Sequence, residues 1–164
     1  NETFDNLEWF GRGPHESYWD RKTSAKIDRY KGKVIDQTYK YVRPQETGNK
    51  TDIRWLALYN GSVGLMVKGL PVFDGSVHHY DYALLDYYKG SQLHGKTDIT
   101  KGDQIDLIVD HKQMGVGGDN SWGAKPHPKY TLPMDTTVYN LEYAIIPFNK
   151  KNELDALSRL NMDN

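Results

Sequence analysis

The 164-residue chain contains no cysteine, so it can form neither a disulfide framework nor a thiolate metal site, and its redox compartment is left open. It has no apolar run long enough to cross a bilayer, and its first residues, NETFD, lack the basic and apolar regions of a signal peptide. It also lacks an excess of one charge, because 21 basic and 22 acidic side chains give a net charge of -1. Without a long-range electrostatic field, nucleic acids and membrane surfaces are poor candidate partners.

Aromatic residues are abundant instead, with twelve tyrosines and four tryptophans, and this bias favours sheet over helix. Residues 53–59 and 62–68 flank Asn60-Gly61, the dipeptide that best fits a two-residue type I′ turn with positive φ at both central positions. The pattern therefore predicts a β-hairpin across this dipeptide.

Further short, β-rich runs predict strands, and their number indicates an all-β, antiparallel sandwich. These runs cover residues 5–10, 34–42, 104–110 and 138–146. In the third run, Ile105, Leu107 and Val109 alternate with more polar positions, which predicts one packed face. Helix signals are confined to residues 81–89 and 153–160, the latter with Asn152 as a candidate cap. We expect one domain over residues 1–150 and a tail over 151–164 that can form a short helix.

A loop over residues 114–123, MGVGGDNSWG, places one large aromatic, Trp122, at the end of a segment with few side chains. Its glycines allow unusual backbone conformations and close approach by a ligand or another chain, while Asp119 and Asn120 tolerate left-handed turns and bond their own backbone. The indole of Trp122 suits the C–H face of a sugar ring. The alternative is a tryptophan that folds back onto the core.

Other chemistries fit the sequence less well. The six histidines show no H-E-x-x-H spacing, and no EF-hand acidic ladder surrounds the glycines, so no metal site is expected. The adjacent His78 and His79 point to opposite faces of a strand, which predicts one buried and one solvated ring. Neither a dinucleotide fingerprint nor a nucleophile elbow fits the loop, so Ser121 is interpreted as a turn residue.

A dense set of charged residues lies near the start of the chain, in residues 10–21 (FGRGPHESYWDR). We interpret it as a structural network in which Arg12 or Arg21 contacts Glu16 or Asp20. A ligand site is the alternative. No acid–base pair of carboxylates can be named, because the spacing of residues in a β-protein does not fix their separation in space.

Three segments together resemble one known family. They are residues 9–21 (WFGRGPHESYWDR), residues 41–49 (YVRPQETGN), and residues 110–122 (DHKQMGVGGDNSW) continuing into 127–132 (HPKYTL). In this order they resemble the C-terminal domain of bacterial β-galactosidases of glycoside hydrolase family 2, also called the β-galactosidase small chain. The resemblance covers most of the chain.

The resemblance implies a galactose-mutarotase-like super-sandwich, of which this chain looks like the later part. It also implies a catalytic (β/α)₈ barrel in the same polypeptide, which holds both glutamates of a retaining mechanism and the Mg and Na ions. By the same resemblance Trp122 stacks on the second sugar of a galactoside, and Gly117, Gly118, Asp119, Asn120 and Ser121 shape its loop. The chain itself then contributes no catalytic residue, metal ligand or cofactor site. One departure is the segment from Ala83 to His94, where the family has a longer helix with a spaced histidine.

Three functions follow in order of preference. The first is a segment of a β-galactosidase that completes a pocket built mainly by the barrel, the second is an independent carbohydrate-binding module, and the third is a scaffold for oligomer contacts. Half a sandwich would leave strand edges unpaired, which permits a homo-oligomer. The natural substrate and linkage are not fixed by the sequence, and the compartment is left open between bacterial cytoplasm and periplasm.

Overall fold

The computed structural model describes residues 1–42, 45–81, 100–120 and 122–160. The described elements are, in chain order, β1 (Asn6–Gly13), β2 (Lys26–Lys33), the 3-10 turn η1 (Val34–Gln37), β3 (Lys50–Asn60), β4 (Val63–His78), β5 (Asp106–Asp110), η3 (Pro128–Tyr130), β6 (Tyr143–Phe148), η4 (Lys151–Glu153) and the short helix α2 (Leu154–Ser158). In these ranges, no helix combines the length and apolar character that crossing a membrane requires.

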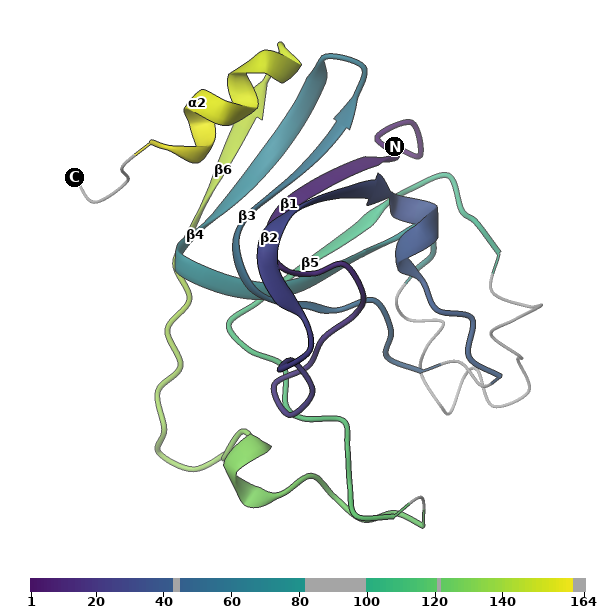
Figure 1. Ribbon diagram of the computed structural model, residues 1–164, viewed down its shortest axis with the longest axis vertical. Coiled ribbons are helices and arrows are strands. Elements are labelled where there is room, and N and C mark those ends of the chain that lie inside the picture. The colour runs from purple at the N-terminus through teal and green to yellow at the C-terminus, as the bar shows by residue number, and fades with distance from the viewer. Residues whose placement is uncertain (43–44, 82–99, 121, 161–164) are drawn as a thin grey trace.

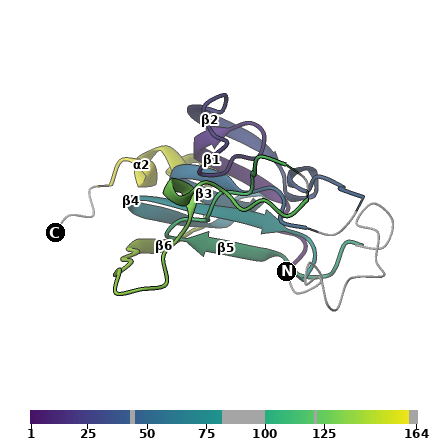
Figure 2. The ribbon, with the colours of Figure 1, turned by 90° about the horizontal axis from the view of Figure 1, so that it is seen from below.

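The strands form one antiparallel sheet in the order β2-β1-β3-β4-β5, as Figure 2 shows from below. This arrangement confirms the all-β antiparallel class and is consistent with a sandwich fold. The long strand β4 has two partners on the same side, because Gly64–Gly69 pair with β6 and Asp74–His78 pair with β5. Residues 111–142, which connect β5 to β6, therefore leave and rejoin the sheet along a single strand (green to yellow-green in Figure 1).

The predicted hairpin forms between β3 and β4, but its turn differs from the expected type. Asn60 pairs with Val63, so Gly61 and Ser62 are the central residues of the turn. Of these two, Gly61 has a positive φ of 58° and Ser62 does not. These φ signs match a type II′ turn, in which glycine occupies the first central position. The prediction of a hairpin is confirmed, and the prediction of a type I′ turn is wrong by one residue in register.

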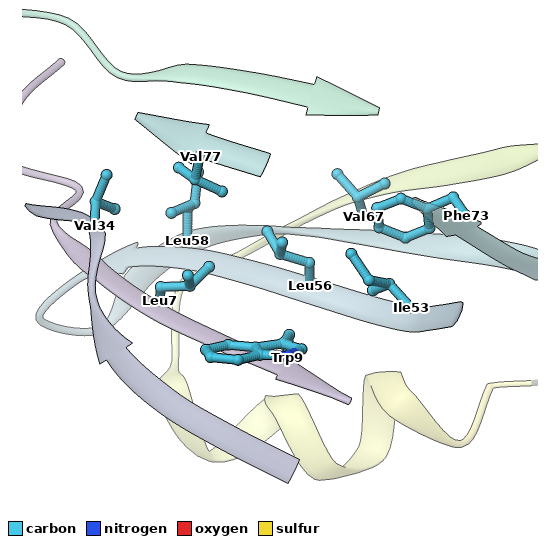
Figure 3. Close-up of a cluster of buried hydrophobic side chains, with 9 residues drawn as sticks. All are labelled: Leu7, Trp9, Val34, Ile53, Leu56, Leu58, Val67, Phe73 and Val77. Atoms are coloured by element: carbon cyan, nitrogen blue, oxygen red, sulfur yellow. The ribbon is translucent and has the colours of Figure 1, made fainter. Parts of the chain in front are cut away.

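Both faces of β3 are buried, because alternate residues of a strand point to opposite sides of the sheet. On one face lies the main core, whose buried members are Leu7, Trp9, Val34, Ile53, Leu56, Leu58, Val67, Phe73 and Val77 (Figure 3). Ile105, Leu107 and Val109 pack against this cluster, which confirms the packed face predicted for residues 104–110. The other face carries a second cluster that contains Trp55, Ala57 and Tyr59.

The helix α2 covers the second cluster and so joins the C-terminal residues to the sheet. Leu154 is buried in that cluster and Leu157 packs against it. Arg29 of β2 forms ion pairs with both Asp155 of α2 and the fully buried Glu8 of β1. The helix is shorter than the predicted range of 153–160, and Glu153 rather than Asn152 occupies the N-cap position. The predicted helix at residues 81–89 and the segment around His94 lie, from residue 82 on, outside the described residues.

Two strand predictions differ from the structure. Residues 34–42 were expected to be extended, yet Val34–Gln37 form η1 and the rest is irregular where it is described. The chain instead forms β2 immediately before, over Lys26–Lys33, where polar and charged residues predominate. An edge strand tolerates such a sequence, since only one of its sides pairs with a neighbour and charges protect the other. The strand expected at 138–146 begins later, as β6 at Tyr143, and runs to Phe148.

Candidate functional site

The candidate site lies on the connection between β5 and β6, where Trp122 keeps 92% of its surface exposed. The expectation that an aromatic ring is presented at the end of this loop agrees with the structure, and the alternative of a tryptophan folded into the core does not. Gly117, Gly118, Asp119 and Asn120 are exposed in the same loop, whereas Ser121 lies outside the described residues. The indole is therefore available to a ligand or to another part of a larger protein.

Polar contacts tie the tip of this loop to itself. The backbone N–H of Trp122 donates to Oδ1 of Asn120 at 2.8 Å, a local turn of the kind expected for asparagine. Asp119 instead reaches Nε2 of His127 across the loop at 2.8 Å. Neither Asp119 nor Asn120 adopts the left-handed conformation, which Gly123 adopts instead with a φ of 97°. The tip is thus shaped by side-chain contacts on both sides of Trp122.

The base of the loop is held by residues from two other segments. The N–H of Gly115 donates to the carbonyl oxygen of Tyr130 at 2.8 Å. The two carboxylate oxygens of Asp20 accept hydrogen bonds from successive backbone amides, from Val116 at 3.2 Å and from Gly117 at 2.8 Å. The sequence predicts Asp20 in an ion-pair network near the start of the chain, whereas in the structure its carboxylate binds the loop.

Two hollows adjoin the loop. The smaller has a volume of about 210 Å³ and is lined by Asp20, Gly117, Gly118, Asp119, His127 and Tyr130. The larger, of about 540 Å³, lies between the start of the loop and the residues Tyr18, Arg21, Tyr41, Gln45 and Glu46. Both are open and lined by polar and aromatic groups, a surface suited to binding hydroxyl-rich molecules or a neighbouring domain.

Beside the larger hollow, the buried carboxylate of Glu16 joins several segments. It accepts hydrogen bonds from the N–H of Gly48 at 2.8 Å, from the hydroxyl of Tyr18 at 3.3 Å and from the hydroxyl of Tyr41. Arg21 approaches it at 3.5 Å, which confirms one pair of the predicted network. Hydrogen bonding to Glu16, followed by burial, raises the pKa of Tyr41. Glu16 therefore serves the structure of this region, because its oxygens are occupied by groups of the same chain.

The other arginine of the predicted network has a different partner. Arg12 donates from Nε to Asp52 Oδ2 at 2.5 Å, and Lys22 donates to Asp52 Oδ1 at 2.9 Å. Burial opposes ionisation of Asp52, but the hydrogen bonds from Arg12 and Lys22 prevail and lower its pKa. Asp52 has a positive φ of 54° at an irregularity in the β3–β4 pairing. The network binds the end of β1 and the segment between β1 and β2 to β3, at the centre of the sheet.

Asp74 and the two adjacent histidines are buried on or next to β4. Burial raises the pKa of Asp74 to about 6, although its oxygens accept hydrogen bonds from the backbone amides of Asp52 and Gln113. His78 and His79 are both buried, so the prediction that one of them is solvated is wrong. Nε2 of His79 lies 2.7 Å from Oδ1 of Asp5, and burial lowers the pKa of His78 to about 4.

The exposed loop offers a binding surface, and the carboxylates near it are engaged within the chain. Among residues 1–42, 45–81, 100–120 and 122–160, no group of three or more metal-ligating side chains is close enough to hold an ion. The carboxylates of Glu16, Asp20 and Asp52 are all engaged by donors of this chain. What the loop can supply chemically is an exposed aromatic ring, that of Trp122.

Comparison with known proteins confirms the resemblance seen in the sequence. The family described as "Beta galactosidase small chain" matches residues 1–145. The beta-galactosidase of Priestia megaterium is 47% identical over 133 residues, which cover 80% of this chain and 12% of that protein. The beta-galactosidase of Vibrio cholerae is 38% identical, over 82% of this chain and 12% of that protein. That of Halalkalibacterium halodurans is 35% identical, over 80% of this chain and 13% of that protein.

The chain thus spans only 12 to 13% of the length of these curated relatives. The family match extends from the first residue into β6 and includes the whole loop that carries Trp122. On this match and these identities, the chain belongs to the β-galactosidase small chain family.

Proposed function

We propose that this chain is the C-terminal segment of a β-galactosidase that hydrolyses terminal non-reducing β-D-galactosides. The names and lengths of the relatives support this proposal, since all three are beta-galactosidases of which the chain matches about an eighth. Catalysis by two glutamates with retention of configuration, and the Mg and Na ions, are assigned to a (β/α)₈ barrel elsewhere in the polypeptide. No catalytic step is assigned to residues of this chain.

In this proposal Trp122 forms the outer wall of the substrate pocket and stacks on the aglycone sugar. The observation that carries it is the 92% exposure of Trp122 on a loop whose backbone is tied at its tip and base. The apolar face of the indole therefore does not pack against its own chain and is free to contact another molecule. A C–H face of a sugar laid on the indole covers that surface without requiring a charged partner.

The isolated chain is expected to release no galactose from a chromogenic galactoside, because the proposed catalytic glutamates lie in another domain. It should also bind lactose very weakly in calorimetry, since one wall of a pocket gains little of the contact needed to offset the cost of association. Turnover above the buffer rate would contradict the proposed division of labour. Tight lactose binding by the isolated chain would favour an independent carbohydrate-binding module instead.

Replacing Trp122 by alanine in the full-length enzyme should impair substrates that have a second sugar. Covering about 80 Å² of apolar surface at about 25 cal/mol per Å² is worth about 2 kcal/mol, so kcat/KM for lactose should fall about 30-fold. Methyl β-D-galactoside has no second ring and serves as the control substrate, for which less than about a twofold change is expected. Equal losses for the two substrates would refute the stacking role of Trp122.

A further inference from the structure

The indole ring of Trp122 is almost fully exposed, and its residue is held through the backbone N–H, which donates to Asn120. The position of the indole is therefore determined by whatever fixes the backbone on either side of it. On the N-terminal side, residues 111–120 contain no strand or helix that could do this. Gln113 and Gly115 donate to Asp74 and Tyr130, and the amides nearest the tip, those of Val116 and Gly117, donate to Asp20, which is distant in sequence.

Asp20 is itself held in a tight reversal of the chain. Tyr18 and Arg21 exchange two backbone hydrogen bonds, at 2.8 and 3.2 Å, and leave Trp19 and Asp20 at the tip. Tyr18 is buried, with 2% of its surface exposed. The neighbouring Trp19 packs edge-on against Tyr130, whose carbonyl oxygen accepts the N–H of Gly115. The two residues at the tip of this reversal thus contact two parts of the connection between β5 and β6, Asp20 at Val116 and Gly117 and Trp19 at Tyr130.

The carboxylate of Asp20 binds two successive amides, one to each oxygen, which is an arrangement that fixes both the position and the orientation of a peptide segment. The glycines at this point match the close approach. A Cβ atom at Gly115 would lie 2.6 Å from Cγ and Oδ2 of Asp20, and one at Gly117 would lie 3.0 Å from Oδ2. The room that these glycines leave is filled by Asp20 of the same chain rather than by a ligand.

From Gly117 to Trp122 the constraint continues through the tip. Asp119 is paired with His127, and Asn120 accepts the N–H of Trp122. The backbone at Gly117 leads directly to Asp119 and Asn120, and through Asn120 its position bears on the backbone of Trp122. We propose that Asp20 is a positioning residue, which acts through Val116 and Gly117 to hold Trp122 at the aglycone sugar. This inference rests on the proposed function of Trp122 and assigns to the reversal at residues 18–21 a part in substrate preference.

The test is a double-mutant cycle in the full-length enzyme with Asp20→Ala, Trp122→Ala and the double variant. Asp20→Ala should lower kcat/KM for lactose about 10-fold, mainly through KM, and change that for methyl β-D-galactoside less than about twofold. In the Trp122→Ala background, Asp20→Ala should cost less than about a further twofold, because the group that it positions is absent. Asp28→Ala, which removes an exposed aspartate of β2, is the matched control and should change neither substrate.

A second readout does not depend on activity. In this 164-residue chain, amide hydrogen exchange at Val116 and Gly117 should become at least about 10-fold faster in Asp20→Ala and should be unchanged in Asp28→Ala. The inference is overturned if Trp122→Ala impairs lactose while Asp20→Ala does not, or if the two amides keep their protection. It is also overturned if Asp20→Ala lowers kcat/KM equally for both substrates. The same holds if Asp20→Ala lowers kcat/KM for lactose as much in the Trp122→Ala background as in the parent enzyme. If Trp122→Ala leaves lactose hydrolysis unchanged, the proposed function itself fails and this inference fails with it.

Discussion

Replacing Glu16 by leucine is expected to destabilise this chain by about 3–5 kcal/mol, the cost of removing one partner from a buried, charged network. The substitution leaves the N–H of Gly48 and the hydroxyls of Tyr18 and Tyr41 without their acceptor. It also removes the negative charge that opposes the effect of burial on Lys50, whose pKa burial lowers to about 8. Urea unfolding at pH 7, followed by circular dichroism, measures the loss.

Two further variants separate the charge of Glu16 from its shape. Glu16→Gln keeps the length of the side chain and one acceptor oxygen, so its loss should be smaller, about 1–3 kcal/mol. Glu142→Leu replaces an exposed glutamate and should stay within about 0.5 kcal/mol of the parent chain. A Glu16→Leu chain as stable as the Glu142→Leu chain would show that the network contributes nothing to the fold.

The second large effect is a pair of opposing pH dependences that arise from Asp74 and His78. The pKa of His78 falls from 6.5 to about 4 on folding, chiefly through burial. Between these values the unfolded chain binds a proton that the native chain does not, so acidification from pH 6.5 to 4 destabilises the fold, by about 3 kcal/mol at 1.36 kcal/mol per unit. The pKa of Asp74 rises from 3.8 to about 6 on folding, also chiefly through burial. There the native chain binds the extra proton, so acidification stabilises the fold by a similar amount, about 3 kcal/mol.

These two contributions nearly cancel in the parent chain and become visible when either group is removed. Relative to the parent, Asp74→Asn should lose about 3 kcal/mol as the pH falls from 6.5 to 4, and His78→Gln should gain about as much. The double variant should follow the parent. Urea titrations of all four chains at intervals between pH 4 and 7 provide the measurement, and other titrating groups cancel in the differences. Parallel curves for the four chains would contradict the opposing shifts.

The parts of the fold that sequence could predict are those set by neighbouring residues. The β3–β4 hairpin follows from Gly61 between two apolar runs, and the packed face of β5 follows from the alternation of Ile105, Leu107 and Val109. The edge strand β2 was missed because its charged residues carry no apolar alternation and its place in the sheet comes from pairing with β1. Likewise, the β-branched side chain of Val34 is buried in η1 and not in a strand.

For the candidate site, the sequence indicated the loop and its exposed tryptophan but not the contacts that hold them. Asp20 lies far from Val116 and Gly117 along the chain, and Asp5 lies far from His79, so no local pattern connects them. The one local signal of this contact is the pair of glycines at 115 and 117, because glycine permits close approach by another group. That the approaching group is a carboxylate of the same chain could be learned only from the fold.

The pairing of β4 with both β5 and β6 has a consequence for how this site can change over time. Residues 111–142 connect β5 to β6, and both of these strands pair in antiparallel register with β4. The connection is therefore an insertion whose two ends are fixed on one strand. Residues between them can be exchanged, added or removed while β5 and β6 keep their alignment on β4 and the two hydrophobic clusters keep their buried members. A new rim can therefore evolve, or be engineered, on an unaltered frame.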